Sequence, residues 1–372
     1  MAIISSDPLV NSSDVSIIID DNETISVTNL RYSQKINSAR IVEFSVNSLE
    51  DSLKCRLGAK ITVLVGRVPP NVNTITNSAT NFGYSYTNHY HFQGIIRQVS
   101  PTPHGASVTA YDYISLLKTS QIEEFKAEDV IGRDLFTLIA DAANIEQIDT
   151  TNLVGGIGID ATPEMGLTGL KTRKQFIDLC IANSVSIATD SSKYFDAINP
   201  VYYQYAIKTN NVFDIYKLDP DNVNNKPVLS VSLNSNNAYN ISPTIDTQRL
   251  INSLTVENQK IGLVFTHNDN SSISQYGVAS SLVSTNETRR EVIETTAFEI
   301  VSRFSKPTIK YEIEISNDNA YCLGQYVSVT SNIIGERTLP IQSISTDFDG
   351  GITTLSLGEK ELSVQELIRL VR

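Results

Sequence analysis

The feature that most constrains the fold of this chain is an internal repeat. Residues Leu57–Val63 read LGAKITV, and residues Leu323–Val329 read LGQYVSV. An alternating strand pattern precedes each copy, at Ile41–Val46 in the first and at Ile309–Ile315 in the second. Because glycine beside a strand favours a tight bend, each copy predicts a strand that turns into the wall of a small barrel. The repeat therefore predicts two similar β-units in one chain.

Each copy also continues into a hairpin. In the first, Ile96–Val99 leads to a Pro/Gly turn through Pro101, Pro103 and Gly105. In the second, Ile341–Ile344 leads to a turn at Gly350. Gly and Pro at these places are typical of turns between strands. The hairpins extend the similarity of the two predicted units.

A long polar segment, Pro69–Asn88, is found only in the first copy. Its Pro, Asn, Thr, Ser and Gly content predicts a loop or extended hairpin. Phe82, Tyr84 and Tyr86 lie within it and are candidates for contact with another protein.

The middle of the chain has a helical pattern instead. One apolar stripe at helical spacing is formed by Ile131, Leu135, Leu138, Ile139 and Ala142. A second helix is predicted to begin at Thr172, because Gln175 completes the spacing of a capping box. Strand patterns return at 201–207 and 213–218. Together these segments predict a small α+β domain between the two β-units.

The last third returns to strands, interrupted by one long helix. This helix is predicted to begin at a capping box formed by Ser284 and Glu287 and to end before Pro307. A short C-terminal helix has an apolar surface made of Leu367, Ile368, Leu370 and Val371. This surface packs either against its own domain or against a neighbouring subunit, and the sequence leaves both open.

The predicted fold class is mainly β with an α+β insertion. Residues 1–120 form the first β-barrel, 121–245 the inserted α+β domain, and 246–362 the second β-barrel with one long helix. Residues 363–372 form the C-terminal helix. Strands before and after a helical segment, rather than alternating with helices, favour this division.

The charge of the chain argues against nucleic-acid binding. Lys and Arg number 29 against 41 Asp and Glu, which gives a formal net charge of −12. Proteins hold phosphate backbones through Lys and Arg, so we do not expect this chain to grip DNA or RNA.

The sequence also bears on the cellular compartment. The first residues have neither the basic segment nor the apolar run of a signal peptide, and no apolar run is long enough for a membrane helix. Cys55, Cys180 and Cys322 are widely spaced and are expected to be buried free thiols. We expect synthesis in a cytoplasm and no membrane insertion.

Candidate chemical groups are few, and the simpler interpretation is favoured for each. His89 and His91 would share a face of a strand, but nearby Cys or carboxylate ligands are missing, which favours surface or interface histidines over a metal site. The glycines of 155–158 lack the ending of a phosphate-binding loop and predict a connector. The remaining candidates lie in predicted turns, where Asp is common: Asp14, Asp20, Asp21, Asp219, Asp221, Asp347 and Asp349. The sequence thus predicts neither an enzyme nor a bound metal or cofactor.

Six short segments occur in a fixed order over nearly the whole chain. They are Phe92–Ile96, Ser107–Asp112 followed by Leu116 and Leu117, Arg249–Val256, Gln275–Gly277, Leu323–Val327 and Gly351–Gly358. Each is short and degenerate, but their order resembles the hub proteins of bacteriophage tail baseplates. That family is similar to the N-terminal part of type VI secretion spike proteins.

The resemblance implies two barrels similar to tail-tube subunits in each chain, and a ring of three chains. Six barrels would then face a hexameric tail tube, while threefold symmetry faces a trimeric spike or tail-tip protein. Other baseplate proteins are further expected partners, and DNA would pass through the lumen without specific binding. An acidic inner wall would repel its phosphates. The implied location is the virion tail baseplate, assembled in the bacterial host cytoplasm.

Two other functions remain open at this point. The chain could be the hub of a related contractile injection or secretion machine, which shares the same parts. It could also be a tail-associated cell-wall hydrolase, although we find no pattern of acid, base or nucleophile to support this.

Overall fold

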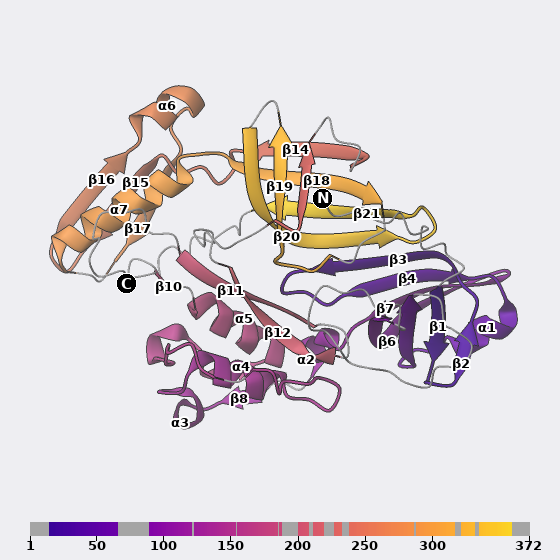
Figure 1. Ribbon diagram of the computed structural model, residues 1–372. Coiled ribbons are helices and arrows are strands. Elements are labelled where there is room, and N and C mark those ends of the chain that lie inside the picture. Colours follow the sequence, from indigo (N-terminus) through magenta and orange to yellow (C-terminus); the bar gives the residue numbers. More distant parts are fainter. Residues whose placement is uncertain are drawn as a thin grey trace.

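The computed structural model describes residues 15–65, 89–120, 123–153, 155–184, 186–187, 200–207, 211–218, 227–232, 238–285, 288–316, 321–331 and 335–358 (Figure 1). Its largest element is a 13-stranded sheet that contains both predicted β-units. The predicted fold class, mainly β with an α+β insertion, is confirmed.

The first β-unit is a sheet curled around one core. Its strands are β1 (Val15–Ile19), β2 (Glu23–Ile25), β3 (Thr28–Lys35), β4 (Ile41–Val46), β5 (Lys60–Val65), β6 (His89–Thr102) and β7 (Gly105–Tyr111). They hydrogen-bond in the antiparallel order β3-β4-β7-β6-β5-β1-β2. Every strand contributes apolar side chains to the same buried cluster, as expected for strands with one inward face. Helix α1 (Leu49–Lys54) follows β4.

The second β-unit has six strands. They are β13 (Leu229–Ser232), β14 (Asn240–Asp246), β18 (Thr308–Ser316), β19 (Tyr326–Ser331), β20 (Gly335–Asp347) and β21 (Ile352–Gly358). Their order is β14-β18-β21-β20-β19-β13, and all contribute to a second core. The predicted boundary between residues 245 and 246 falls inside β14, all of whose residues pair with β18.

The internal repeat is confirmed by the hydrogen bonds of the two units. β4, β7, β6 and β5 of the first unit correspond in order to β18, β21, β20 and β19 of the second. The amide of Gly58 donates to the Ile96 carbonyl at 2.9 Å, and the amide of Gly324 donates to the Ile341 carbonyl at 2.9 Å. Both glycines have positive φ, 86° and 78°, which only glycine adopts without strain. A bulge follows Ile96 in β6 and Ile341 in β20.

The units differ at their outer strand. β1 runs antiparallel to β5, whereas β13 runs parallel to β19. In the second unit this place is taken by β13, which follows the inserted body in the sequence, whereas β1 of the first unit is followed directly by its partner β2.

The inserted body is α+β, as predicted. Its helices are α2 (Ile114–Thr119), α3 (Ala127–Val130), α4 (Leu135–Ala143) and α5 (Arg173–Asn183), with a 3₁₀ turn η2 (Pro163–Met165). Its strands are β8 (Glu123–Phe125), β9 (Gly169–Lys171), β10 (Ser186–Ile187), β11 (Pro200–Ile207) and β12 (Phe213–Leu218). The apolar stripe of α4 is buried, and the capping box of Thr172 and Gln175 is present at α5.

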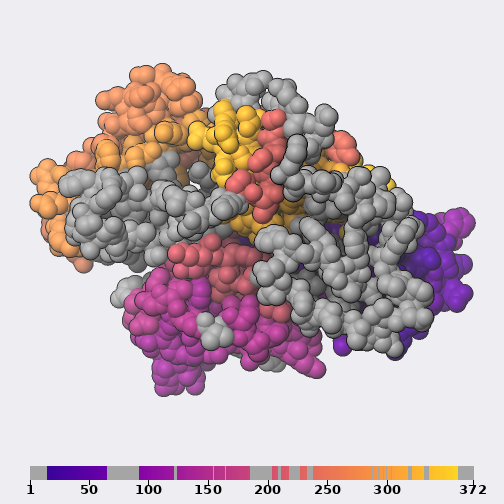
Figure 2. All heavy atoms as spheres, in the orientation of Figure 1, coloured from indigo at the N-terminus to yellow at the C-terminus, as the bar shows by residue number. Residues whose placement is uncertain are grey.

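Residues 251–305 form a sheet and core of their own, within the range predicted for the second barrel. Strands β15 (Ser253–Asn258), β16 (Leu263–Asn268) and β17 (Ser280–Ser284) pair in the order β16-β15-β17. Helix α6 (Asn270–Tyr276) connects two of them, and α7 (Arg290–Phe304) packs on the sheet. This lobe projects at one end of the molecule in Figures 1 and 2.

Three local predictions were wrong. The long helix begins at Arg290 without a side-chain cap, because Ser284 pairs with Glu257 and is extended there. Residues 25–28 alternate in the sequence as one strand would, but they are the end of β2 and the start of β3, and the sequence did not show the rest of β3. Pro101 lies within β6, so the turn before β7 is shorter than predicted.

Candidate assembly surface

The two β-units meet edge to edge inside the chain. Residues 343–347 of β20 pair antiparallel with residues 31–35 of β3, and we call this contact the internal joint. At its ends the amide of Ile36 donates to the Gln342 carbonyl at 3.1 Å, and the amide of Phe348 donates to the Leu30 carbonyl at 3.1 Å. The joint turns two curled sheets into one hydrogen-bonded surface.

Side chains exchanged across the internal joint reinforce it. Phe348, from the turn after β20, is 3% exposed and packs in the core of the first unit. Ile36, from the turn after β3, is 8% exposed and packs in the core of the second unit. An ion pair of Arg31 and Asp347 at 3.6 Å lies on the surface, where such pairs add little. Most of the free energy of the joint therefore comes from its ladder and these two apolar side chains.

The outer face of this surface is polar across eight strands, from β14 to β6. Residues that pair across neighbouring strands point to the same side of a sheet, so the registers define the face. It carries Asn240, Ser242, Thr244, Lys310, Glu312, Glu314, Thr354, Ser356, Ser343, Ser345, Asp347, Arg31, Ser33, Lys35, Glu43, Ser45, Thr109, Ser107, Gln98 and Ser100, and the same registers add three larger side chains, Ile41, Tyr111 and Ile352. Short hydroxyl side chains predominate, and the charges are mixed. We call it the polar face.

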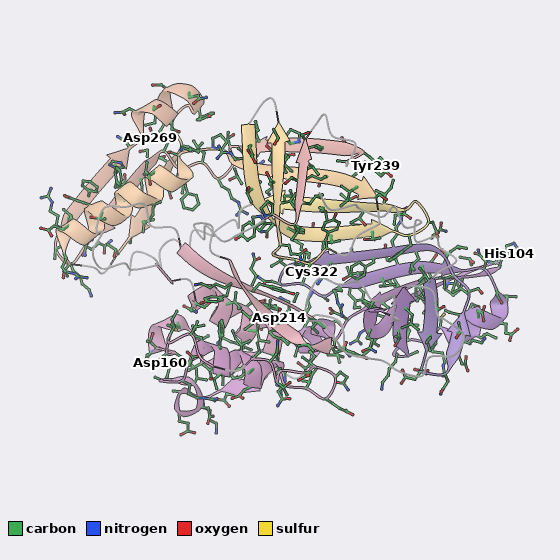
Figure 3. The ribbon with its side chains drawn as sticks, viewed as in Figure 1. His104, Asp160, Asp214, Tyr239, Asp269 and Cys322 are labelled. Atoms are coloured by element: carbon green, nitrogen blue, oxygen red, sulfur yellow. The ribbon has the colours of Figure 1, made fainter. Side chains whose placement is uncertain are left out.

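The polar face ends in two strand edges, one from each unit. β14 is the last strand of the row at one end, and among the strands that the structure describes it pairs only with β18. At the other end, residues 98–102 of β6 pair with β7, and no described strand lies on their other side. Figure 3 marks these ends with Tyr239, just before β14, and His104, at the tip of the β6–β7 hairpin.

A buried ion pair anchors the first unit next to the inserted body. Arg40 Nε lies 3.0 Å from Asp112 Oδ2, and the two residues are 3% and 0% exposed. The other Asp112 oxygen accepts the amide of Ile114 at 3.1 Å, at the start of α2. Burial raises the pKa of Tyr32 to about 12, against the opposing effect of the neighbouring Arg40. Asp112, the last residue of the segment Ser107–Asp112 singled out in the sequence, thus connects β4, β7 and the first helix of the body.

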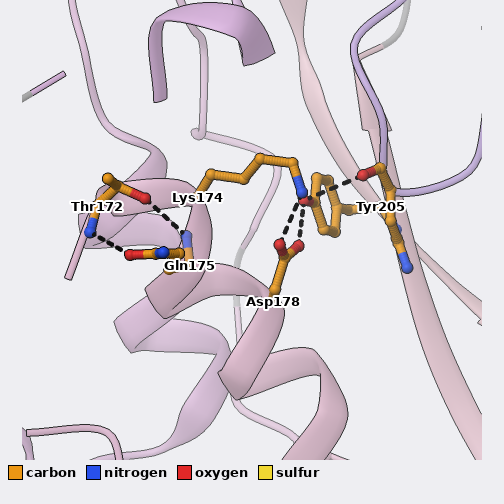
Figure 4. A network of polar contacts seen from close by, with 6 residues as sticks. Thr172, Lys174, Gln175, Asp178 and Tyr205 are labelled. Carbon is orange, nitrogen blue, oxygen red and sulfur yellow. Dashed lines mark hydrogen bonds and ion pairs between the residues drawn. The ribbon is translucent and has the colours of Figure 1, made fainter. Parts of the chain in front are cut away.

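A second polar contact joins the same unit to α5 and β11 (Figure 4). Asn37, in the turn between β3 and β4, accepts the amide of Tyr205 through its side-chain oxygen at 2.8 Å. The Tyr205 hydroxyl donates to Asp178 at 2.6 Å, and Lys174 pairs with Asp178 at 2.7 Å. Burial and the Asp178 carboxylate raise the pKa of Tyr205 well above its ordinary value. The inserted body is therefore fixed to the turn beside the internal joint.

The sequence-predicted interface residues lie outside the described ranges: Phe82, Tyr84, Tyr86, Leu367, Ile368, Leu370 and Val371. The sequence missed a different apolar group on the first unit, formed by Leu49 and Leu53 of α1 and by Leu57, which are 64%, 79% and 69% exposed. Leu49 and Leu53 are four residues apart beside Glu50 and Asp51, a pattern that predicts one apolar helix face.

The other chemical candidates have structural roles where they are described. Asp20 and Asp21 form a turn with positive φ, and Asp347 accepts the amides of Asp349 and Gly350. The glycine-rich connector at residues 155–158 is held in place by the amide of Gly158, which donates to the Asp134 carboxylate at 2.8 Å. Within the described ranges no cluster of metal-binding side chains occurs, and no helix is long and apolar enough to cross a membrane.

The three cysteine thiols differ in their exposure to solvent. Cys55 and Cys180 are buried as predicted, and burial raises the pKa of Cys180 to about 12. Cys322 is exposed, so its predicted burial was wrong. It precedes the bend at Gly324, where the second unit meets the first unit and the inserted body (Figure 3).

Comparison with known proteins gives matches in structure only. No family model matches the sequence, and no curated protein does. The tail protein from Neisseria meningitidis MC58 is 12% identical with a TM-score of 0.54, and the match covers 95% of this chain and 98% of that one. The 43 kDa tail protein of prophage MuSo2 from Shewanella oneidensis is 12% identical with a TM-score of 0.57 and the same coverage.

This chain has the fold of phage tail proteins. The likeness extends over nearly the full length of both chains, so it includes the two β-units, the inserted body and the lobe of residues 251–305. At this identity it concerns the fold. The fold expected from the sequence resemblance is confirmed.

Proposed function

We propose that this protein is a structural hub of a phage tail baseplate, in which three copies form a ring with six similar β-units. The observation that carries the proposal is the internal joint, which places two units of matching strand order side by side in one sheet. A ring contact repeats when like surfaces recur at regular angles. Two units per chain let three chains present six such surfaces.

The free edges support ring closure. β3 of the first unit takes part in the internal joint, and its counterpart in the second unit is β14. β20 takes part from the second unit, and its counterpart in the first is β6. Both counterparts are free edges in the described chain, so one chain offers the two halves of a second joint. Pairing between copies would remove both edges, which otherwise invite aggregation.

The polar face supports passage of DNA through such a ring. Ser and Thr hydroxyls predominate on it, and the acidic side chains of Glu43, Glu312, Glu314 and Asp347 stand against the basic ones of Arg31, Lys35 and Lys310. A wall without a cluster of Lys and Arg forms few ion pairs with the phosphates of DNA and therefore does not hold it. In this proposal the polar face lines the lumen, one side of the ring contacts a hexameric tail tube, and the other contacts a trimeric spike.

Native mass spectrometry and negative-stain electron microscopy at high protein concentration test the ring. We expect trimers with six lobes around a hole. The purified chain should also bind the end of a tube formed by the tail-tube protein of the same genome. A chain that stays monomeric alone and with that tube protein would contradict the proposal.

The role proposed here is structural rather than enzymatic, since the matched structures are tail proteins. A peptidoglycan zymogram of the purified chain addresses the hydrolase alternative directly. A clear lysis band that survives further purification would contradict the structural assignment. The genes beside this one would distinguish a phage tail from a secretion machine.

A further inference from the structure

The two units can be aligned residue by residue through their hydrogen-bonded registers. Ile96 and Ile341 both lie before the bulge, and they pair with Ala110 and Leu357 respectively. Following the registers outward makes Tyr32 of β3 the counterpart of Pro243 in β14.

The same alignment relates β6 to β20. Thr346 pairs with Thr353 and Pro101 pairs with Ala106, which makes Pro101 the counterpart of Thr346. Pro103 follows β6 as Phe348 follows β20.

Tyr32, Thr346 and Phe348 point their backbone N–H groups into the internal joint. In an antiparallel ladder, the residues that exchange hydrogen bonds with one neighbour alternate along the strand. The hydrogen bonds at the ends of the joint, from Ile36 to Gln342 and from Phe348 to Leu30, therefore make Tyr32 and Thr346 a hydrogen-bonded pair between them. Tyr32, Thr346 and Phe348 thus contribute three of its donors.

At the free edges all three counterparts are proline. Pro243, Pro101 and Pro103 have no N–H, and three of the chain's 12 prolines thus fall on the outward-facing positions of these two edges. Proline within a sheet is confined to edges where its nitrogen faces away from the neighbouring strand, which agrees with their places here. The apolar anchors are also absent, because the counterparts of Ile36 and Phe348 are the exposed Thr247 and Pro103.

We propose that each free edge receives a second copy of this chain, and that Pro101, Pro103 and Pro243 weaken this contact so that unassembled copies do not polymerise. The proposal deepens the proposed function and rests on it, because the occupant is the next chain of the ring. The internal joint has a full ladder and two apolar anchors, so it forms when the chain folds. The joint between copies lacks three donors and both anchors, so it forms only when other contacts hold the ring.

Restoring the donors tests the proposal. The variants are Pro243→Thr for β14, Pro101→Thr with Pro103→Thr for β6, and all three together, measured by sedimentation velocity over a range of concentrations. Each recovered hydrogen bond is expected to raise the association constant about fivefold, and all three on the order of 100-fold. Pro163→Thr is the matched control, because it replaces an exposed proline that lies in the inserted body and belongs to neither edge.

The outcomes separate the two proposals. A triple variant that retains the wild-type circular dichroism spectrum but sediments as the wild type at every concentration would overturn the role of the prolines. Pro243→Thr alone, with its smaller expected shift, keeps the test valid if the triple variant does not fold. If the wild type never forms a trimer while the triple variant associates, the ring fails and the role of the prolines stands. An equal shift in Pro163→Thr would also overturn it.

Discussion

The two β-units share their strand order, the glycine bend and the bulge, but they bury different side chains at one end of the shared strands. The first unit encloses the ion pair of Arg40 and Asp112 next to α2. In the second unit, the registers place half-buried Ile309 at the position of Arg40. The comparison shows that the backbone hydrogen bonds define the unit, whereas the side chains at its ends decide what each copy is attached to.

The largest expected effect tests that difference directly. Asp112→Ala leaves the buried Arg40 guanidinium without its carboxylate, which is expected to lower the free energy of unfolding by about 3–5 kcal/mol. Ile309→Ala, at the position that matches Arg40 in the second unit, is expected to cost only about 1–2 kcal/mol, because this side chain is half-buried. Urea unfolding followed by circular dichroism measures both. Equal losses would mean that the ion pair does not distinguish the units.

The next effect concerns the side chains exchanged at the internal joint. Phe348→Ala is expected to lower the free energy of unfolding by about 3 kcal/mol, and Ile36→Ala by about 2 kcal/mol, because each leaves a cavity in the other unit's core. Thr247→Ala, at the exposed counterpart of Ile36, should change stability by less than about 0.5 kcal/mol. The same unfolding measurement applies, and a loss at Thr247 as large as at Ile36 would contradict the unequal roles of the two edges.

The pH dependence that Tyr32 causes should belong to the first unit, since Pro243 stands at the matching position of the second unit. The pKa of Tyr32 is raised to about 12, above the value near 10 of the unfolded chain. The folded state therefore keeps a proton that the unfolded state loses, so this stabilisation is complete below pH 10 and is lost as the pH rises toward 12.

Because burial also raises the pKa of other tyrosines, such as Tyr113 and Tyr311, the measurement is the difference between wild type and Tyr32→Phe. We expect the stability of the wild type to fall more steeply with pH than that of the variant between pH 10 and 11.5, by about 1–2 kcal/mol. Parallel curves would show that Tyr32 ionises as easily in the folded chain as in the unfolded one.

The smallest effect is one of reactivity rather than stability. Cys55 of the first unit is buried with a pKa raised to about 11 by desolvation, whereas Cys322 of the second unit is exposed. Iodoacetamide at pH 8 should label Cys322 at least about tenfold faster than Cys55, because the thiolate is the reactive form. Peptide mass spectrometry over time measures both rates, and Cys322→Ser identifies the fast site.

The sequence predicted the repeat because both copies carry local signals, a glycine bend and alternating strands. It did not predict most of β3, whose apolar residues are few and whose partner β20 lies some 300 residues later in the chain. Pairing between strands so distant in sequence leaves no short-range pattern.

The candidate site was predicted less well for the same reason. Pro101 and Pro103 were interpreted as a turn, although the first lies in β6. Phe348 and Ile36 lie at turns, where exposure is the usual expectation, and only the joint explains their burial. The expected interface residues lie outside the described ranges, so they remain predictions.

The position of Phe348 has a consequence for biosynthesis. The first unit is translated early, but its interior keeps a hole until a residue near the far end of the 372-residue chain emerges from the ribosome. An interrupted translation product would carry an incompletely filled first unit, which favours its recognition by chaperones and proteases.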